Sequence, residues 1–150
     1  MPPSVECPAC GHRFGAFTPP ETPRVAVDAI IETRPGSVVL VKRRFPPHGW
    51  ALPGGFMETG EDTDTAVRRE VREETALELT DLAQFRCYST PDRDPRLHTV
   101  SVVYTARAAG EPKGGDDAAD AETFPLDALP ALAFDHADIL RDYRDHRASA

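Results

Sequence analysis

The sequence predicts a mixed α/β domain in which helices cover a central mixed sheet, in an α/β/α sandwich, with a short cysteine-containing arm before it. Segments rich in Val and Ile lie on both sides of one helical segment that lacks Gly and Pro, and a second helical segment follows near the end. A chain of 150 residues can bury one ordinary core but not two. We therefore expect an arm at residues 1–23 and one domain at residues 24–150.

The composition excludes several classes of protein. A net charge of -8 disfavours binding to a nucleic-acid backbone or an anionic membrane surface, both of which reward clustered Lys and Arg. No apolar run approaches the roughly 18 residues that cross a bilayer, and the N-terminus has neither a basic start nor an apolar segment. We expect a cytoplasmic protein. An acidic chain that handles phosphates would need a divalent cation between itself and its substrate.

The arm carries the one informative cysteine spacing. Cys7 and Cys10 are three apart, as in half of a tetrahedral zinc site, and His12 follows them. A complete site would need further ligands from His12, Cys87 or a dimer partner. The alternative, which we favour, is a tail with two reduced thiols. Zinc, where bound, would be structural.

The domain is expected to begin with two strands. Residues 24–32 and 37–44 are rich in Val and Ile, and turn residues at 34–36 lie between them, so we predict a hairpin. A short apolar piece at 50–52 then enters a glycine turn at 53–55.

A helix follows at residues 62–75. This segment lacks Gly and Pro, Asp62 can cap its first turn, and Ala66, Val67 and Val71 recur at helical spacing. The same criteria predict the remaining elements, which are strands at 79–88, 99–106 and 122–126, a polar loop at 91–98, an exposed acidic loop at 113–120 and a terminal helix at 135–147.

Three carboxylates cluster on one face of the predicted helix. Glu70, Glu73 and Glu74 are three or four residues apart, a spacing at which like charges cost about 0.2 to 0.5 kcal/mol a pair. A helix selected only for stability would avoid this arrangement. The alternative is a solvated face whose carboxylates pair with the neighbouring arginines Arg68, Arg69 and Arg72.

The glycine turn before this helix favours a metal site. Gly54 and Gly55 lack side chains, so their backbone atoms can approach a ligand closely. Carboxylates together with a carbonyl make the oxygen environment that Mg²⁺ or Mn²⁺ prefers. Such an ion neutralises a diphosphate and activates water.

The segment from Gly55 to Leu77 resembles the Nudix box. That pattern is Gly, five residues, Glu, seven residues, Arg-Glu, an aliphatic residue, any residue, Glu-Glu, any residue, Gly and an aliphatic residue. Every charged position of the pattern is present, from Glu61 to Glu74. Ala76 stands where the family usually has Gly, which affects helix termination and no ligand.

The resemblance implies a metal-dependent pyrophosphohydrolase and assigns roles by position. The implied metal ligands are Glu70, Glu74, the Gly54 backbone carbonyl and, when several cations bind, Glu73. Arg69 and Glu61 would form a pair that orients the glutamates.

The family often adds an acidic residue outside the box, as a base or an extra ligand. Glu122 has the expected position, but Asp120, Asp116 and Asp117 are close competitors. The alternative for Glu122 is a carboxylate at a strand edge.

Stretches beyond the box resemble prokaryotic ADP-ribose pyrophosphatases within the family. They are residues 45–55, 88–100 and 133–136, and the resemblance covers about 24–144. It implies hydrolysis of ADP-ribose to AMP and ribose 5-phosphate, often by a homodimer. The alternatives are a pyrophosphohydrolase of normal or oxidised nucleoside triphosphates and a domain that senses ADP-ribose without cleaving it.

Side chains that could contact such a substrate lie in these stretches. Guanidinium groups suit phosphate oxygens. Four arginines are candidates for this contact, namely Arg43, Arg44, Arg93 and Arg96. The alternative for each is a solvated position. Phe45 and Trp50 could stack on adenine, although an aromatic residue entering a sheet is more often part of the core.

Overall fold

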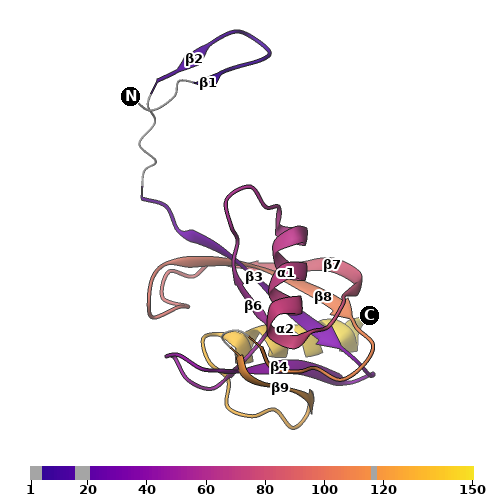
Figure 1. The fold of residues 1–150 in the computed structure, drawn as a ribbon. Coiled ribbons are helices and arrows are strands. Elements are labelled where there is room, and N and C mark those ends of the chain that lie inside the picture. The colour runs from indigo at the N-terminus through magenta and orange to yellow at the C-terminus, as the bar shows by residue number, and fades with distance from the viewer. Residues whose placement is uncertain (1–4, 16–20, 116–117) are drawn as a thin grey trace.

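The computed structural model describes residues 5–15, 21–115 and 118–150. Two sheets and two helices form the body of the protein, and a short hairpin lies near the N-terminus (Figure 1). The elements are β1 (Val5–Glu6), β2 (Arg13–Phe14), β3 (Arg24–Glu32), β4 (Ser37–Arg43), β5 (Trp50–Ala51), β6 (Gly54–Phe56), α1 (Thr63–Thr75), β7 (Thr80–Tyr88), β8 (Thr99–Arg107), β9 (Ala118–Pro125) and α2 (His136–Ser149).

The larger sheet is mixed, as predicted. Its strand order is β6-β3-β8-β7, with β3 and β8 parallel and the other pairs antiparallel. A second, antiparallel sheet has the order β5-β4-β9. The single central sheet of the prediction is therefore divided in two.

The predicted hairpin of the first two strands is wrong. β3 pairs with β6 and β8, whereas β4 pairs with β5 and β9, so the turn between them joins two sheets. Strand β3 is buried on both faces from Ala26 to Ile31, which suits a strand with partners on either side. The turn residues correctly predicted a change of direction but could not specify the partner.

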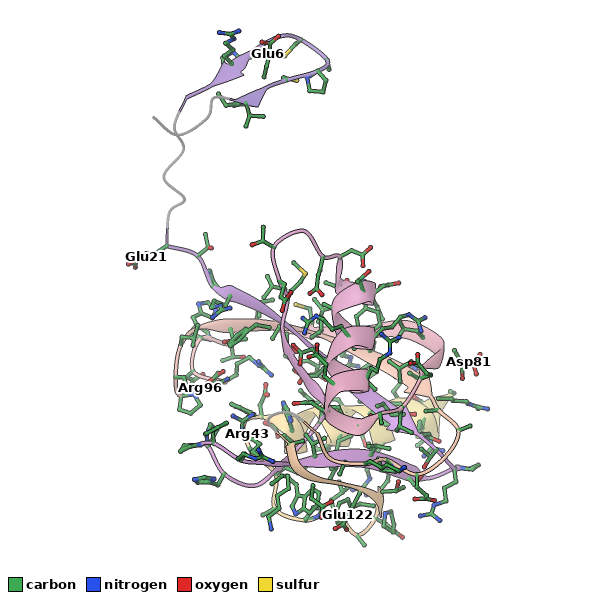
Figure 2. The ribbon with its side chains drawn as sticks, viewed as in Figure 1. Glu6, Glu21, Arg43, Asp81, Arg96 and Glu122 are labelled. Carbon is green, nitrogen blue, oxygen red and sulfur yellow. The ribbon has the colours of Figure 1, made fainter. Side chains whose placement is uncertain are left out.

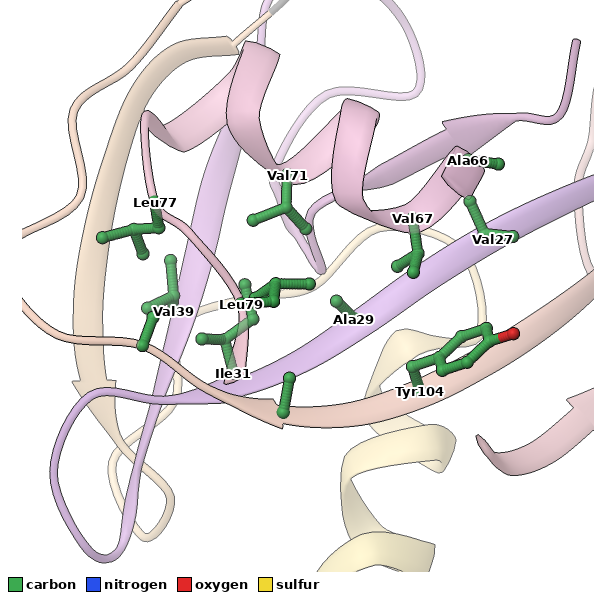
Figure 3. Close-up of a cluster of buried hydrophobic side chains, with 12 residues drawn as sticks. Val27, Ala29, Ile31, Val39, Ala66, Val67, Val71, Leu77, Leu79 and Tyr104 are labelled. Atoms are coloured by element: carbon green, nitrogen blue, oxygen red, sulfur yellow. The ribbon is translucent and has the colours of Figure 1, made fainter. Parts of the chain in front are cut away.

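Helix α1 packs on one face of the sheets. Asp62 caps it by accepting a hydrogen bond from the Thr65 amide at 2.7 Å, as predicted. Its apolar stripe, Ala66, Val67 and Val71, is fully buried against β3, β4 and β8 (Figure 3). Glu70 and Glu74 lie three or four residues from members of this stripe, so the same packing turns them toward the sheet, where Glu74 contacts the Gly54 amide.

Helix α2 packs on the other face. Ile139, Leu140 and Tyr143 bury against a second cluster that includes Ile30 of β3, whereas Ile31 belongs to the cluster under α1. Neighbouring residues of one strand point to opposite faces, so the two helices lie on opposite sides. The α/β/α arrangement is confirmed.

Two loops contain more regular structure than predicted. Strand β9 begins at Ala118, which is buried, inside the segment expected to be an exposed acidic loop. Pairing with β4 explains this, because Ala118 lies opposite Arg43. In the N-terminal arm, β1 and β2 pair as a small hairpin where no strand was expected. No helix in the described part of the chain is long and apolar enough to cross a membrane.

Candidate active site

A pocket of about 740 Å³ is lined by residues of β3, β6 and α1 and by the segments that follow β4 and β7. Its volume lies in the range of small-molecule sites. Carboxylates of α1 and β3 line one part, and arginines and aromatic rings line another. These groups come from segments far apart in sequence, among them residues 24–28, 43–45, 54–59, 70–74, 93–99 and 134–136.

The glycine turn and the acidic face of α1 meet in this pocket. Glu74 Oε2 accepts a hydrogen bond from the Gly54 amide at 2.9 Å. A Cβ atom on Gly55 would lie 2.5 Å from Glu70 Cδ, and one on Gly54 would lie 2.1 Å from the Val27 carbonyl oxygen. Both glycines are therefore required by close contact, as their adjacency to the predicted helix indicated.

Arg69 holds the outer edge of this cluster. Its Nε donates to Glu61 Oε1 at 2.6 Å, and its Nη1 donates to Glu70 at 2.9 Å and to Glu73 at 3.2 Å. Nη2 donates to the Phe56 carbonyl. The hydrogen bond from Arg69 is the main cause that lowers the pKa of Glu61 to about 2. The structure thus brings together the pair that the sequence predicted to orient the glutamates.

The two inner glutamates lie in an unfavourable environment for negative charge. Burial raises the pKa of Glu74 to about 8, and the nearby carboxylates of Glu70 and Asp28 add to the rise, whereas the Gly54 amide opposes it. Burial also raises the pKa of Glu70. A divalent cation would relieve this, and carboxylates beside a backbone turn are the donors that Mg²⁺ or Mn²⁺ takes. The residues present fit such an ion.

The other acidic candidates lie outside the pocket lining. The Glu73 side chain is 41% exposed and pairs with Arg69. Glu122 is exposed on β9, opposite Leu40, and Figure 2 shows it apart from Arg43 and Arg96. Within the residues described, no group of three or more His, Cys, Asp or Glu is placed to hold an ion.

Of the competitors of Glu122, Asp116 and Asp117 lie outside the described residues. Asp120 is exposed on β9, and its carboxylate accepts a hydrogen bond from the Ala121 amide. The assignment of an acidic residue beyond the box stays a prediction.

All four candidate arginines line the pocket, in different settings. Arg43 donates to the Pro47 carbonyl at 2.7 Å and lies over the Phe134 ring. Arg96 makes two hydrogen bonds to the Asp94 carboxylate and lies over the same ring. Arg44 also lines the pocket, and the fourth arginine, Arg93, forms an ion pair with Asp135.

Arg93 has a structural environment. Its side chain is only 4% exposed, and it makes two hydrogen bonds to Asp135, which immediately precedes α2. A guanidinium engaged in this way ties the loop after β7 to the start of α2, which leaves it little capacity to bind a phosphate.

Two polar groups beside the glutamates, Asp28 and His136, were not predicted from the sequence. Asp28 lines the pocket from the middle of β3 and accepts a short hydrogen bond from Ser101. His136 is fully buried, accepts a hydrogen bond from the Leu52 amide at 2.9 Å, and lies 3.8 Å from Asp28. Burial lowers the pKa of His136. A charged residue within the apolar run of β3 was the available signal for Asp28.

The two aromatic candidates, Trp50 and Phe45, differ in burial. Trp50 packs edge-on against Phe124 at 4.8 Å beside the core under α2, which confirms the core interpretation. Phe45 is 56% exposed and lines the pocket, so the core interpretation was wrong for it.

Cys7, Cys10 and His12, all within the described part of the arm, are not placed together to hold an ion. Hydrogen bonds from the backbone of Ala9 and Cys10 lower the pKa of Cys7. The Cys7 amide also donates to the His12 carbonyl, which closes the small hairpin. Cys87 is a free, exposed thiol on β7.

The comparisons with known proteins agree with this geometry. The model of the NUDIX domain matches residues 22–143. An ADP-ribose pyrophosphatase of Methanocaldococcus jannaschii is 49% identical over 124 residues, which are 81% of this chain and 73% of that protein. The NAD-capped RNA hydrolase NudC of Pseudomonas aeruginosa is 34% identical over 85% of this chain but only 44% of its own length.

A solved structure extends the likeness to the fold. The NUDIX domain of Shewanella oneidensis NrtR, crystallised with ADP ribose, superposes with a TM-score of 0.75 at 28% sequence identity. The match covers 84% of this chain and 89% of that chain.

Proposed function

The chain belongs to the NUDIX family, and from that premise we propose that it hydrolyses ADP-ribose to AMP and ribose 5-phosphate. The observation that carries the proposal is the buried pair Glu70 and Glu74, held against the Gly54–Gly55 turn on the wall of a pocket with arginines. An anionic diphosphate fits between these two kinds of group when a cation is present.

The metal would be held by Glu70, Glu74 and the Gly54 carbonyl, with Glu73 as a further ligand when several cations bind. Nudix hydrolases generally use divalent cations, and we propose Mg²⁺ or Mn²⁺ here. When bound, such an ion neutralises phosphate charge and lowers the pKa of water. Arg69 and Glu61 keep the carboxylates in place through the hydrogen bonds described above.

The reaction also involves water and the arginines of the pocket. Water attacks one phosphorus of the diphosphate, the bond to the bridging oxygen breaks, and the two phosphates of the products separate. Phosphate oxygens accept hydrogen bonds from Arg43, Arg44 and Arg96. These cations reduce the repulsion between the phosphates and the two inner glutamates. Arg93 and the backbone shape the loop on which Arg96 lies.

The ADP-ribose assignment draws on the similarity to the ADP-ribose pyrophosphatase of Methanocaldococcus jannaschii and to the NrtR domain crystallised with ADP ribose. The first alternative is a nucleoside triphosphate, normal or oxidised, because the box binds a diphosphate and loops select the rest. The second is a sensor that binds ADP-ribose without cleaving it. The presence of every box glutamate favours hydrolysis over sensing.

Product analysis of the purified protein with Mg²⁺ or Mn²⁺ tests the proposal. The panel includes ADP-ribose, NADH, dinucleoside polyphosphates, NAD-capped RNA and normal and oxidised nucleoside triphosphates. Selective formation of AMP from ADP-ribose is the expected result. Preference for a triphosphate would replace the substrate, and tight binding of ADP-ribose without turnover would establish the sensor.

Two further proposals concern assembly. We propose a homodimer, which the elution volume on size-exclusion chromatography tests. For Cys7 and Cys10 we favour two reduced thiols over a structural zinc ion with His12 as a further ligand, because the described residues contain no group of three His, Cys, Asp or Glu placed to hold an ion. Metal analysis of the purified protein and of Cys10→Ser tests this choice, because zinc that is unchanged in the variant cannot depend on this thiol.

A further inference from the structure

His136 is a buried histidine of the pocket that has no role in the reaction proposed above. It is the first residue of α2, its side chain is only 4% exposed, and it lines the pocket beside Asp28. Burial of a polar ring is costly unless its nitrogens find partners. The partners of the two ring nitrogens therefore indicate what the ring does.

The two ring nitrogens of His136 contact different segments of the chain. Nδ1 accepts a hydrogen bond from the Leu52 amide at 2.9 Å, so Nδ1 carries no proton and the neutral ring carries its proton on Nε2. Nε2 lies 3.8 Å from Asp28 Oδ1, which is too long for a direct hydrogen bond but places the N–H dipole beside a carboxylate. The ring thus links the segment before the glycine turn to strand β3.

Both partners of His136 lie next to Gly54. Leu52 precedes Gly54 by two residues, and Asp28 is the residue of β3 that pairs with Gly54 of β6. A Cβ atom on Gly54 would lie 2.5 Å from Asp28 Oδ1, so this carboxylate packs directly against the glycine. Asp28 is itself held by the hydrogen bond from Ser101. His136 therefore contacts the neighbours of Gly54 both along the chain and across the sheet.

Gly54 in turn contacts the carboxylate end of the pocket. Its amide donates to Glu74 at 2.9 Å, and its carbonyl is the proposed backbone ligand of the cation. Because each peptide unit is planar, the directions of this amide and this carbonyl depend on how the segment 52–54 is held. The Leu52 amide is held by His136, and the Pro53 carbonyl accepts a hydrogen bond from the Ala29 amide at 2.9 Å.

We propose that His136 is a positioning residue that orients Gly54 for the catalytic cation, through its hydrogen bond with the Leu52 amide and its contact with Asp28. This rests on the proposed function, because it concerns the cation which that function requires. Residues that orient the ligands of a metal contribute roughly 10- to 100-fold in metal affinity or activity. Since His136 acts through Gly54, its loss should change metal binding and kcat and leave KM almost unaltered.

The test compares His136→Leu, His136→Asn and His136→Gln with the wild-type protein. Leu is apolar and has no acceptor. The Asn oxygen can lie near the position of Nδ1, whereas the Gln amide is one methylene farther out, near the position of Nε2. The control is His146→Leu, which changes an exposed histidine of the same helix away from the pocket lining. Calorimetric titration of the metal-free protein gives the Mn²⁺ affinity, and steady-state rates with ADP-ribose give kcat and KM.

We expect His136→Leu and His136→Gln to bind Mn²⁺ about 10- to 100-fold more weakly and to lose kcat by a similar factor, while KM stays within about threefold. His136→Asn should keep Mn²⁺ affinity and kcat within about threefold of the wild-type values, because its oxygen accepts the hydrogen bond from the Leu52 amide. His146→Leu should change none of these quantities. Where His136→Leu fails to fold, the comparison of His136→Asn with His136→Gln decides.

Three outcomes would overturn the proposal. The first is a wild-type Mn²⁺ affinity in His136→Gln. The second is equal weakening in His136→Asn and His136→Gln, which would assign the ring to the stability of α2. The third is a raised KM with unchanged Mn²⁺ affinity, which would place the ring against the substrate. Absence of ADP-ribose turnover in the wild-type protein would instead refute the proposed function, while the Mn²⁺ titration would still test the role of His136.

Discussion

The two ends of the pocket are built in different ways. At the carboxylate end, Glu70 and Glu74 project from a helix packed on the core and contact the backbone of the Gly54–Gly55 turn. At the arginine end, defined by Arg43, Arg44, Arg96 and Phe134, side chains of connecting segments contact one another. We therefore expect the proposed chemistry to depend on main-chain packing and substrate selectivity to depend on loops. Substitutions at the first end should lower kcat, and those at the second should raise KM.

The largest effect is expected for Glu74→Gln. Loss of one carboxylate weakens the binding of the cation, whose stabilisation of the transition state is worth several kcal/mol. We therefore expect kcat to fall by about 10²- to 10³-fold, while the far-ultraviolet circular dichroism stays unchanged. Glu78→Gln is the control, because Glu78 pairs with Arg72 in solvent. Activity of Glu74→Gln near the wild-type value would remove Glu74 from the proposed ligand set.

Gly55→Ala tests the main-chain packing at the same end. A Cβ atom 2.5 Å from Glu70 Cδ must displace that carboxylate, so we expect a fall in kcat of about 10- to 100-fold. At Gly15 a Cβ atom meets nothing within 4 Å, and Gly15→Ala should be neutral. Steady-state rates of the three proteins decide this, and equal rates would mean that Glu70 tolerates displacement.

Arg96→Ala examines the arginine end. Loss of a charged hydrogen bond to phosphate should raise KM for ADP-ribose about tenfold and leave kcat within about threefold. Arg86→Ala is the matched control, since Arg86 pairs with Asp142 away from the pocket lining. A fall in kcat with unchanged KM would place Arg96 with the chemistry and weaken the division between the two ends.

The raised pKa of Glu74 should make the stability of the metal-free protein depend on pH. The pKa of Glu74 rises from 4.5 in an exposed carboxyl to about 8 in the folded protein, so the folded state binds a proton that the unfolded state releases. The contribution of Glu74 to the free energy of unfolding is therefore greatest below pH 4.5 and declines as the pH rises to 8, by at most about 1.4 kcal/mol per pH unit.

Urea denaturation in EDTA at pH 5.5 and pH 8 measures this decline. Glu74→Gln should lose less stability than the wild-type protein between the two values, because an amide does not titrate there. An equal loss in both proteins would show that Glu74 is ionised at little cost.

The smallest effect concerns the end of the helix that carries the glutamates. Ala76, which stands where the family usually has Gly, ends the helix in a left-handed conformation with φ of 59°. Ala76→Gly should stabilise the protein by about 1 kcal/mol and leave kcat unchanged. Ala148→Gly, in the exposed last turn of α2, should be neutral or destabilising. A loss of stability in Ala76→Gly would show that the methyl group makes a compensating contact.

The sequence predicted those parts of the fold that depend on local patterns. The cap at Asp62, the apolar stripe of α1 and the strands of residues 79–88 and 99–106 follow from spacing, and the structure confirms them. The pairing of β4 with β9 was missed, because the strand partner depends on contacts between distant segments. The N-terminal hairpin was missed because two-residue strands leave no periodicity.

The residues of the candidate site were likewise predicted only in part. Glu70, Glu74 and Gly54 could be named from motif spacing alone, and the structure places them together. Asp28 and His136 could not, since only the tertiary fold brings β3 and the start of α2 to the pocket. The exposed face of Phe45 also depends on packing that a local pattern does not encode.

Calorimetric titration of the metal-free protein with Mn²⁺ tests whether Glu70 and Glu74 hold the proposed catalytic cation. Wild-type protein, Glu70→Gln, Glu74→Gln and the control Glu78→Gln are compared at one pH. We expect Mn²⁺ to bind at least tenfold more weakly to Glu70→Gln and Glu74→Gln and equally well to Glu78→Gln. Equal Mn²⁺ affinity in all four proteins would contradict this assignment.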